Sequence, residues 1–325
     1  MKRIRSVPVR VTMRRLLVVG ATGLVGSKLV KFAPNYGYEA LSTHNARHPE
    51  DSKSFKLDIT DGEATRMLLE EVKPEVIVNT AALHNVDYCE THQEEAHRVN
   101  VEGTANLADT ASKLGSRFIY VSTDYVFDGR TGHYSESDVP NPLHYYARTK
   151  VEGEAVASKV PSYAIARPSV IYGWNPLEAT GIPSSSGKTV NFAMYVLDKF
   201  GKNETVKAVN DQFSSPTFAD NMAEAVLRIA SFDGSGIFHT AGRSCISRYE
   251  FALKIAEVFN YPTTLVQPVS SKDFKQAAER PKNSCLSVDD TERELGVRFL
   301  TAEEGLREMK SQGGTNDPTH SIGSR

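Results

Sequence analysis

The sequence predicts an α/β protein, in which a Rossmann-type parallel sheet with helices on both faces precedes a smaller C-terminal lobe. Three observations predict this fold. Short apolar runs without alternation, such as residues 16–19, recur through the first half, as is typical of strands buried on both faces. Helical segments separate these runs, which favours parallel strands joined by crossovers. A glycine turn, residues 20–26, directly follows the first apolar run.

The elements of the first half follow in order along the chain. The first strand leads through the glycine turn into a helix that Pro34 ends. The second helix stops before Pro74, and the third ends at Gly115, a residue that favours a helix C-cap. The remaining strands are expected at 38–41, 76–78 and 118–121, and the two later helices at about 63–72 and 94–114.

The second half has a different rhythm. Prolines and the Ser-Ser-Ser-Gly run at 184–187 mark long connections there. Brief strands alternate with shorter helices, which are expected at about 190–200, 218–230, 247–259 and 301–310. This change predicts a smaller lobe that closes over the end of the sheet.

The composition excludes several classes of protein. Of 325 residues, 40% are hydrophobic and 24% are charged, as in ordinary globular proteins. No run approaches the roughly 18 apolar residues of a membrane helix, and a net charge of −2 gives no reason to expect a nucleic acid partner. The three cysteines, Cys89, Cys245 and Cys285, predict neither a disulfide framework nor a CxxC metal pair. A reducing cytoplasm is therefore the expected location.

The glycine turn has the composition of a dinucleotide site. Gly20 permits a tight turn, Gly23 lets backbone amides approach a pyrophosphate, and Gly26 lets the helix pack on the strand. The helix N-terminus adds unpaired N–H groups and the positive end of its dipole. Glycines that serve the turn alone are the alternative. The same turn supplies Thr22, Leu24 and Val25 as expected cofactor contacts.

The end of the second strand bears on the choice of cofactor. Residues 41–47 hold no acid for a ribose 2′-hydroxyl, but Arg47 there suits a 2′-phosphate. This predicts NADPH, with NADH as the alternative if Arg47 is only a solvated charge. Asp58, with Ile59 beside it, is expected to contact the adenine; the competing interpretation is a helix N-cap, a role for which Asp61 is also suited.

These features divide the chain into a basic N-terminal arm (1–15), a dinucleotide-binding domain (16–167), a mainly substrate-binding lobe (168–310) and a flexible tail (311–325). The arm lacks the apolar core and cleavage site of a secretory signal, and a start at Met13 is the alternative. The boundary near 168 is approximate, because later strands often return to the main sheet.

Tyr146 and Lys150 lie four residues apart, on one face of an expected helix. A neighbouring ammonium favours phenolate and lowers the phenol pKa, which makes the tyrosine a general acid or base. A second pair of this spacing, Tyr195 and Lys199, lies in the second half and is interpreted as a helix-surface pair. Tyr146 is preferred because it follows Thr123, at the carboxyl end of a parallel strand, where α/β sheets place their ligands.

The glycine turn, Ser122-Thr123-Asp124 and the Tyr146/Lys150 pair, in this order, resemble the extended short-chain dehydrogenase/reductase superfamily. Within it, residues from about 16 to 309 are similar to dTDP-4-dehydrorhamnose reductases. The similarity lies in Val76-Ile77-Val78-Asn79-Thr80-Ala81-Ala82, Val86-Asp87, Arg98-Val99-Asn100, Val121-Ser122-Thr123-Asp124-Tyr125-Val126-Phe127-Asp128-Gly129, Asn210-Asp211-Gln212, Ser215-Pro216-Thr217, Arg280-Pro281 and Asn283-Ser284.

The resemblance implies a reduction that uses NAD(P)H. The 4-keto group of dTDP-4-dehydro-6-deoxy-L-mannose, a nucleotide sugar, becomes the hydroxyl of dTDP-L-rhamnose. Tyr146 is then the proton donor, Lys150 lowers its pKa and holds the nicotinamide ribose, and Thr123 hydrogen-bonds the carbonyl. The remaining implied roles are a proton relay for Asn100, a sugar contact for Asp124, nucleotide contacts for Asn210 and Arg280, and cofactor contacts for Ala81, Ala82, Leu83 and Val121.

The chain departs from the family pattern beside the substrate. Arg167-Pro168-Ser169-Val170 lacks the usual tryptophan, Leu83-His84 replaces a Tyr-Thr pair, and Ala147 replaces a glycine. Because these departures lie beside the substrate, they bear on the identity of the sugar more than on the class of reaction. The scattered histidines give no metal-binding spacing, so no metal is predicted.

Two other functions stay open. One is a non-catalytic NADP-binding regulatory subunit, similar to that of methionine adenosyltransferase, and the other is a sugar-nucleotide epimerase or dehydratase. The intact set of Thr123, Tyr146 and Lys150 favours the reductase. The sequence gives no prediction of the oligomeric state.

Overall fold

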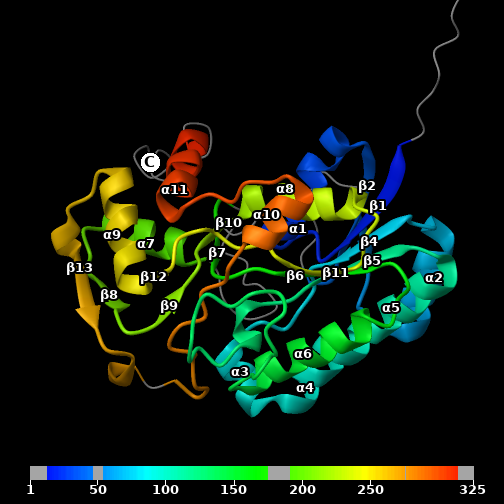
Figure 1. Ribbon diagram of the computed structural model, residues 1–325, viewed down its shortest axis with the longest axis horizontal. Helices are drawn as coiled ribbons and strands as arrows, with labels where there is room; N and C mark the ends of the chain where they lie inside the picture. Colours follow the sequence, from blue (N-terminus) through cyan, green and yellow to red (C-terminus); the bar gives the residue numbers. More distant parts are fainter. Residues whose placement is uncertain (1–12, 47–53, 175–190, 275, 314–325) are drawn as a thin grey trace, which may run out of the picture.

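The computed structural model describes residues 13–46, 54–174, 191–274 and 276–313. Its centre is a seven-stranded parallel sheet in the order β11-β6-β5-β4-β1-β2-β3 (Figure 1). In chain order its strands are β1 (Arg14–Val19), β2 (Tyr38–His44), β3 (Ser54–Lys56), β4 (Val76–Asn79), β5 (Arg117–Val121), β6 (Tyr163–Arg167) and β11 (Gly236–His239). The predicted α/β fold with a parallel sheet is therefore confirmed.

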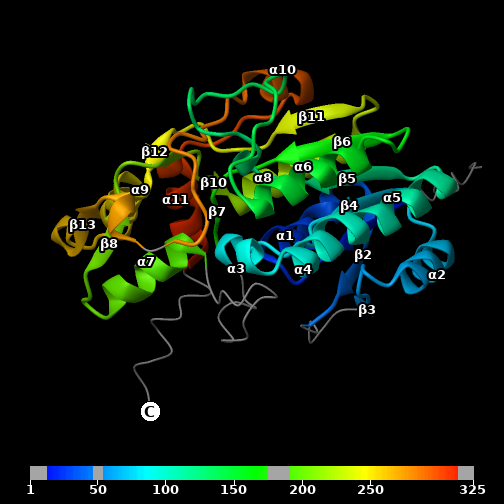
Figure 2. The ribbon, with the colours of Figure 1, turned by 90° about the horizontal axis from the view of Figure 1, so that it is seen from below.

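Helices cover both faces of this sheet (Figure 2). Leu16 and Val18 of β1 pack in one core cluster with side chains of α1 and α8, while Leu17 and Val19 pack in another with α2 and α5. This alternation follows from the two-residue period of a strand, and it explains why β1 is apolar throughout. The covering helices are α1 (Leu24–Phe32), α8 (Ala219–Ser231), α2 (Gly62–Val72), α5 (Gly103–Leu114) and α6 (Tyr145–Ala157).

The smaller lobe has an apolar core of its own, in which side chains of three helices pack on a two-stranded sheet. The elements are α7 (Phe192–Gly201), β8 (Val206–Val209), α9 (Arg248–Phe259), β13 (Val266–Val269) and α11 (Ala302–Gln312). Helix α8 and strand β11 also follow residue 168, yet they belong to the main sheet and its covering layer. The division of the chain at 167/168 stays a prediction.

The expected single helix over 94–114 is present in three parts. Helix α4 (Gln93–His97) continues through a π-helical turn, η2 (Arg98–Glu102), into α5. The remaining elements are η1 (Ala33–Tyr36), α3 (Val86–Thr91), η3 (Asp124–Val126), β7 (Ile171–Tyr172), β9 (Phe213–Ser214), β10 (Thr217–Phe218), β12 (Ile246–Ser247), η4 (Thr263–Leu265), η5 (Ser271–Asp273) and α10 (Asp289–Leu295). Within the described ranges, none of the helices is both long and apolar enough to cross a bilayer.

The expectation that the cysteines form no disulfide is wrong. Cys245 and Cys285 are joined by a disulfide, with their Cα atoms 5.4 Å apart, while Cys89 is a free, buried thiol. The two half-cystines are 40 residues apart in the chain. They meet because β12, directly after Cys245, pairs with β9, and Ser284, directly before Cys285, donates its backbone N–H to Phe213 of the same strand. Sequence spacing alone did not reveal this meeting.

Candidate functional site

The glycine turn between β1 and α1 is shaped by close backbone contacts. Gly20 has φ +82°, and a Cβ there would lie 3.0 Å from the backbone nitrogen of Ala81. A Cβ on Gly26 would lie 2.5 Å from the carbonyl oxygen of Gly20. Gly23 is the N-cap of helix α1, which has no side-chain cap and no acid in its first turn. Its first amides therefore stay available to an anion, which fits the pyrophosphate of a dinucleotide.

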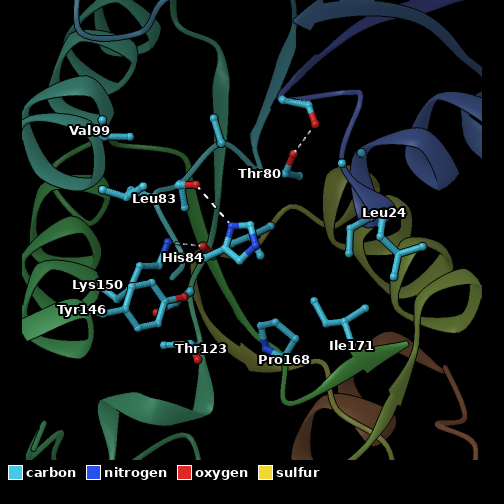
Figure 3. A pocket seen from close by; sticks show the side chains of 18 of the residues that line it. Leu24, Thr80, Leu83, His84, Val99, Thr123, Tyr146, Lys150, Pro168 and Ile171 are labelled. Atoms are coloured by element: carbon cyan, nitrogen blue, oxygen red, sulfur yellow. Dashed lines mark hydrogen bonds between the residues drawn. The ribbon is translucent and has the colours of Figure 1, made fainter. Parts of the chain in front are cut away.

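A cavity of about 980 Å³ begins at this turn and reaches the first turns of α7 and α9 in the small lobe. Figure 3 shows Leu24 on one side of it, with Thr123, Tyr146 and Lys150 together on another. Every described residue that the sequence assigned to the cofactor lines this cavity: Gly20, Thr22, Gly23, Leu24, Val25, Gly26, Asp58, Ile59, Ala81, Ala82, Leu83, Val121, Tyr146 and Lys150. Arg47 lies outside the described residues.

The two competing roles considered for Asp58 are separated in the structure. Asp61 is the N-cap of α2, since its carboxylate accepts the backbone N–H of Ala64 at 2.9 Å. Asp58 instead accepts the backbone N–H and the hydroxyl of Thr60, at 3.0 and 2.8 Å, and it is exposed where it lines the cavity. Its expected adenine contact stays a prediction.

Lys150 and Tyr146 both point into the buried middle of the cavity from α6 (Figure 3). The ammonium of Lys150 donates to the carbonyl of Val121 at 2.7 Å and lies 4.1 Å from the ring centroid of Tyr120. The hydroxyl of Thr123 lies near enough to the phenol of Tyr146 to lower its pKa, although other causes outweigh this. The predicted grouping of the phenol, the ammonium and the threonine is therefore present.

The expected lowering of the Tyr146 pKa by the Lys150 ammonium is absent. Burial raises the pKa of Tyr146, and the nearby Cys89 and Asp124 raise it further. Burial also lowers the pKa of Lys150, to about 7. The prediction that the ammonium lowers the phenol pKa is thus wrong for this arrangement, because desolvation penalises the charged form of both groups.

Asn100 lies in the π-helical turn η2 and is almost fully buried. Its amide accepts the backbone N–H of Leu83 at 2.8 Å and donates to the carbonyl of Leu83 and the hydroxyl of Thr149, each at 3.0 Å. Thr149 in turn donates to the backbone carbonyl of Tyr146 at 2.7 Å. Asn100 therefore ties the loop after β4 to the helix that carries Tyr146, and its expected proton relay stays a prediction.

Asp124 is a buried junction between the sheet and the small lobe. Its carboxylate accepts hydrogen bonds from Ser284 at 2.6 Å, Ser169 at 2.8 Å and Thr123 at 3.1 Å. Burial raises the pKa of this carboxyl, and the three hydroxyls oppose the rise. The side chain lines the cavity, but these contacts already engage both of its oxygens. Its predicted role in touching the sugar stays a prediction.

The two residues expected to contact the nucleotide are placed differently. Arg280 lines the cavity and makes two hydrogen bonds of 2.9 Å to the carboxylate of Asp87, a residue of α3. Its guanidinium therefore lies beside α3. Asn210 is exposed at the end of β8, where its backbone N–H donates to Val269, and it is not among the described residues that line the cavity. The structure thus brings Arg280, but not Asn210, to the cavity wall.

Sequence reasoning missed two residues at the small-lobe end of the cavity. Arg248, the first residue of α9, lines it, as does Tyr195 of α7. The sequence predicts a helix-surface position for Tyr195; its side chain is 40% exposed, and Lys199 pairs with Glu204. Arg248 belongs to no motif, and the spacing of Tyr195 and Lys199 gave no pointer to the cavity, because their lobe folds through long-range contacts.

The described residues include no group of three or more His, Cys, Asp and Glu side chains arranged to hold a metal ion. His92 stacks on Tyr88 with ring centroids 3.7 Å apart, and His97 lies beside Glu102 and Glu152. The expectation of a site without metal stays a prediction.

Residues 13–313 match the family model described as the RmlD substrate binding domain. The chain is 31% identical to a dTDP-4-dehydrorhamnose reductase of Aggregatibacter actinomycetemcomitans over 92% of this chain and 99% of that protein. It is 34% identical to methionine adenosyltransferase 2 subunit beta of Danio rerio over 86% and 84%. Among solved structures, dTDP-4-dehydrorhamnose reductase of Bacillus anthracis in complex with NADP matches with a TM-score of 0.80, at 27% identity, covering 92% of this chain and 99% of that one.

Proposed function

The chain belongs to the family of the RmlD substrate binding domain, and from this premise we propose that it reduces the 4-keto group of a nucleotide-linked 6-deoxy sugar with NAD(P)H. The substrate proposed is dTDP-4-dehydro-6-deoxy-L-mannose, and the product is dTDP-L-rhamnose. The observation that carries the proposal is the meeting of Thr123, Tyr146 and Lys150 in one cavity with the glycine turn.

The glycine turn and the uncapped start of α1 suit the pyrophosphate of the cofactor, and Ala81 to Leu83 form the wall beside it. The cofactor proposed is NADPH, with NADH as the alternative; the Bacillus anthracis relative in complex with NADP supports this. When bound, it supplies the hydride. A clear preference for NADH in measured dissociation constants would contradict the predicted role of Arg47.

Tyr146 is proposed to give its hydroxyl proton to the sugar oxygen as negative charge develops there. Its raised pKa keeps the phenol protonated until that moment. The hydroxyl of Thr123 donates to Asp124 at 3.1 Å in this structure, and we propose that it turns this proton to the same sugar oxygen when the substrate binds. Lys150, held by the carbonyl of Val121, supplies positive charge in the same cavity when it is protonated. All three side chains are buried, and a low local dielectric strengthens each of these interactions.

The test is loss of NADPH absorbance with dTDP-4-dehydrorhamnose made in situ, followed by identification of the sugar formed. Turnover with formation of dTDP-L-rhamnose supports the proposal. Absence of NADPH oxidation with this and other 4-keto nucleotide sugars contradicts it.

A second candidate is a non-catalytic NADP-binding subunit. The 34% identity to methionine adenosyltransferase 2 subunit beta favours it. Co-purification with a methionine adenosyltransferase, together with NADPH binding but no NADPH oxidation, would select this function over the reductase. An epimerase or dehydratase has less support, because its structural likeness concerns the fold alone.

A further inference from the structure

Three polar side chains share one buried face of α6. Tyr146, Lys150 and Glu154 follow one another at intervals of four residues, and all three are buried. Arg148 and Glu152, which lie on the other side of the helix, are exposed. The proposed reduction uses the phenol and the ammonium but gives no role to the carboxylate. A buried carboxylate one turn beyond the ammonium therefore calls for a function.

Arg167 fixes the carboxylate of Glu154 at two points. The Nε and Nη2 atoms of Arg167 donate to the two carboxylate oxygens, at 2.9 and 2.7 Å. Arg167 is the last residue of β6, its side chain is buried, and its guanidinium carbon lies 5.1 Å from the ring centroid of Phe127. Such a two-point contact fixes the plane of a carboxylate. Within the described residues, Glu154 forms its ion pair with Arg167 and none with Lys150, so it acts on the ammonium through its electrostatic field.

Among the described residues, a carbonyl and an aromatic ring hold the ammonium of Lys150. It donates to the carbonyl of Val121 at 2.7 Å and lies 4.1 Å from the ring centroid of Tyr120. The ring of Tyr120 lies against α6, since a Cβ on Gly153 would overlap its hydroxyl. Burial lowers the pKa of Lys150 to about 7, and the charge of Glu154 opposes this fall. Without such opposition, a buried ammonium loses its proton more readily near neutral pH.

The other buried titratable groups around the ammonium are of a different kind. Burial raises the pKa of Tyr120 of β5, and it raises that of Cys89 of α3 to about 11, so both stay neutral at pH 7. Burial also raises the pKa of Asp124 of η3, whose carboxylate is engaged by three hydroxyls. Arg167 of β6 is positive and is bonded to Glu154, and the buried residues of α5 carry no charge. In the part of the chain that the structure describes, these groups leave the ammonium without a direct carboxylate partner.

The charged residues of the helices packed against α6 lie at the surface, where water screens them. They are Asp87 and Glu90 of α3, Glu95 and His97 of α4, and Arg98 and Glu102 of η2, each half-buried or exposed. Glu154 is therefore the negative charge that burial and helix spacing best place to act on the ammonium.

We propose that Glu154 is a positioning residue that keeps the ammonium of Lys150 charged, and that Arg167 fixes the carboxylate in the orientation that does so. This inference rests on the function proposed above, because the charge on Lys150 is the one that stabilises the oxygen anion of the reduction. Glu154 is not among the described residues that line the cavity, so it acts through Lys150 and not on the substrate.

The test is an NMR titration of the full chain with isotope-labelled lysine side chains, in which Lys150→Met assigns the signal of Lys150. We expect this signal to titrate near pH 7 in the wild type. Its midpoint should fall by about one pH unit in Glu154→Gln, because the buried ammonium then lacks its opposing charge. Glu154→Asp, which keeps that charge, should return most of the shift. Glu152→Gln is the matched control, since this exposed carboxylate lies on the same helix, and it should move the midpoint by less than about 0.2 pH unit.

The variant Glu154→Gln leaves the buried Arg167 without its ion-pair partner. The double variant Glu154→Gln/Arg167→Gln, which removes both charges, is therefore measured beside it. The midpoint should fall there as well, because the charge of Glu154 is the one that raises the pKa of Lys150. An unchanged midpoint in whichever of the two variants folds overturns the proposal. Unfolding of both also overturns it, since the pair would then serve the fold and not the ammonium.

The pH profile of turnover gives a second readout that a merely structural role would not move. The kcat of the wild type should fall on the alkaline side as Lys150 loses its proton. In Glu154→Gln this fall should begin about one pH unit lower, with KM nearly unchanged. An equal loss of kcat at every pH contradicts the proposal. If the wild type oxidises no NADPH, the reductase is contradicted, while the NMR titration still decides whether Glu154 holds the charge on Lys150.

Discussion

The cofactor end and the small-lobe end of the cavity are built in different ways. At the cofactor end, residues 20–26 and 81–83 directly follow β1 and β4, so neighbouring strands place them. At the small-lobe end, the cavity wall depends on contacts between distant segments. Arg280 is held by Asp87 of α3, 193 positions away, and the disulfide, outside the described cavity lining, joins residues 40 positions apart. The cofactor end is therefore formed by short segments that follow neighbouring strands, and the small-lobe end is formed by tertiary contacts between distant segments.

This difference has a consequence for stability and activity. A change at the cofactor end acts on a turn that the adjoining strand still supports. A change in the small-lobe contacts alters several segments at once, because Ser284 links its segment to Asp124 and the adjacent Cys285 links it to the start of β12. We therefore expect perturbations of the small lobe to appear first as lost stability, and perturbations of the sheet end to appear first as lost turnover.

The largest expected effect is on stability, from loss of the disulfide. Replacing Cys245 and Cys285 by Ala removes a cross-link with a sequence separation of 40. In the chain-entropy model, such a cross-link stabilises the folded state by about 4 kcal/mol. Urea unfolding of the wild type under oxidising conditions and of the double variant measures the difference in free energy of unfolding.

Cys89→Ala is the matched control, since Cys89 is a free thiol that forms no cross-link. Thiol titration under denaturing, non-reducing conditions should find one free thiol in the wild type. Three free thiols in protein purified under oxidising conditions, or equal midpoints with and without reductant, would show that the cross-link does not stabilise the small lobe.

The next largest effect concerns turnover at the end of the sheet. Tyr146→Phe removes the proposed proton donor and should lower kcat by about 100-fold or more, because general acid catalysis contributes on this scale. NADPH affinity should change little. Tyr145→Phe is the control, because Tyr145 precedes it on α6 and does not appear in the described lining of the cavity. Near-normal turnover in Tyr146→Phe would remove this residue from the mechanism.

The contrast between the two ends also explains what the sequence made predictable. The glycine turn and the grouping of Tyr146 with Lys150 follow from strand ends and helix spacing, and both were predicted. Arg248 was not, because its place depends on how α9 packs. The fall in the pKa of Lys150 was also missed, since desolvation depends on burial by the whole fold. Local patterns thus predicted the sheet end better than the small lobe.

A smaller effect is expected from Asn100→Ala, which tests how the sheet end is supported. The variant leaves the backbone N–H and carbonyl of Leu83 without their amide partner in a buried place. The cost of such unpaired groups is about 2 kcal/mol in free energy of unfolding. NADPH affinity should fall as well, because Leu83 lines the cavity. Ser116→Ala is the control, because Ser116 also loses one buried backbone contact, to Pro74, and neither residue is among the described residues that line the cavity. Unchanged NADPH affinity in Asn100→Ala would mean that the loop after β4 binds the cofactor without its hydrogen bonds to Asn100 of η2.

The smallest expected effect is a pH dependence of stability in the protein without ligand. Burial lowers the pKa of Lys150 to about 7, below its ordinary value of 10.5. Between these two values the unfolded chain binds more protons at this site than the folded chain, so stability should rise with pH through this window. One proton limits the slope to about 1.4 kcal/mol per pH unit. Chemical unfolding at several pH values from 7 to 8, over which the change is about 1 kcal/mol, measures it, and Lys150→Met should lose this contribution while keeping those of the other groups. An identical slope in Lys150→Met would place the titration elsewhere and would mean that burial at the sheet end costs this ammonium little.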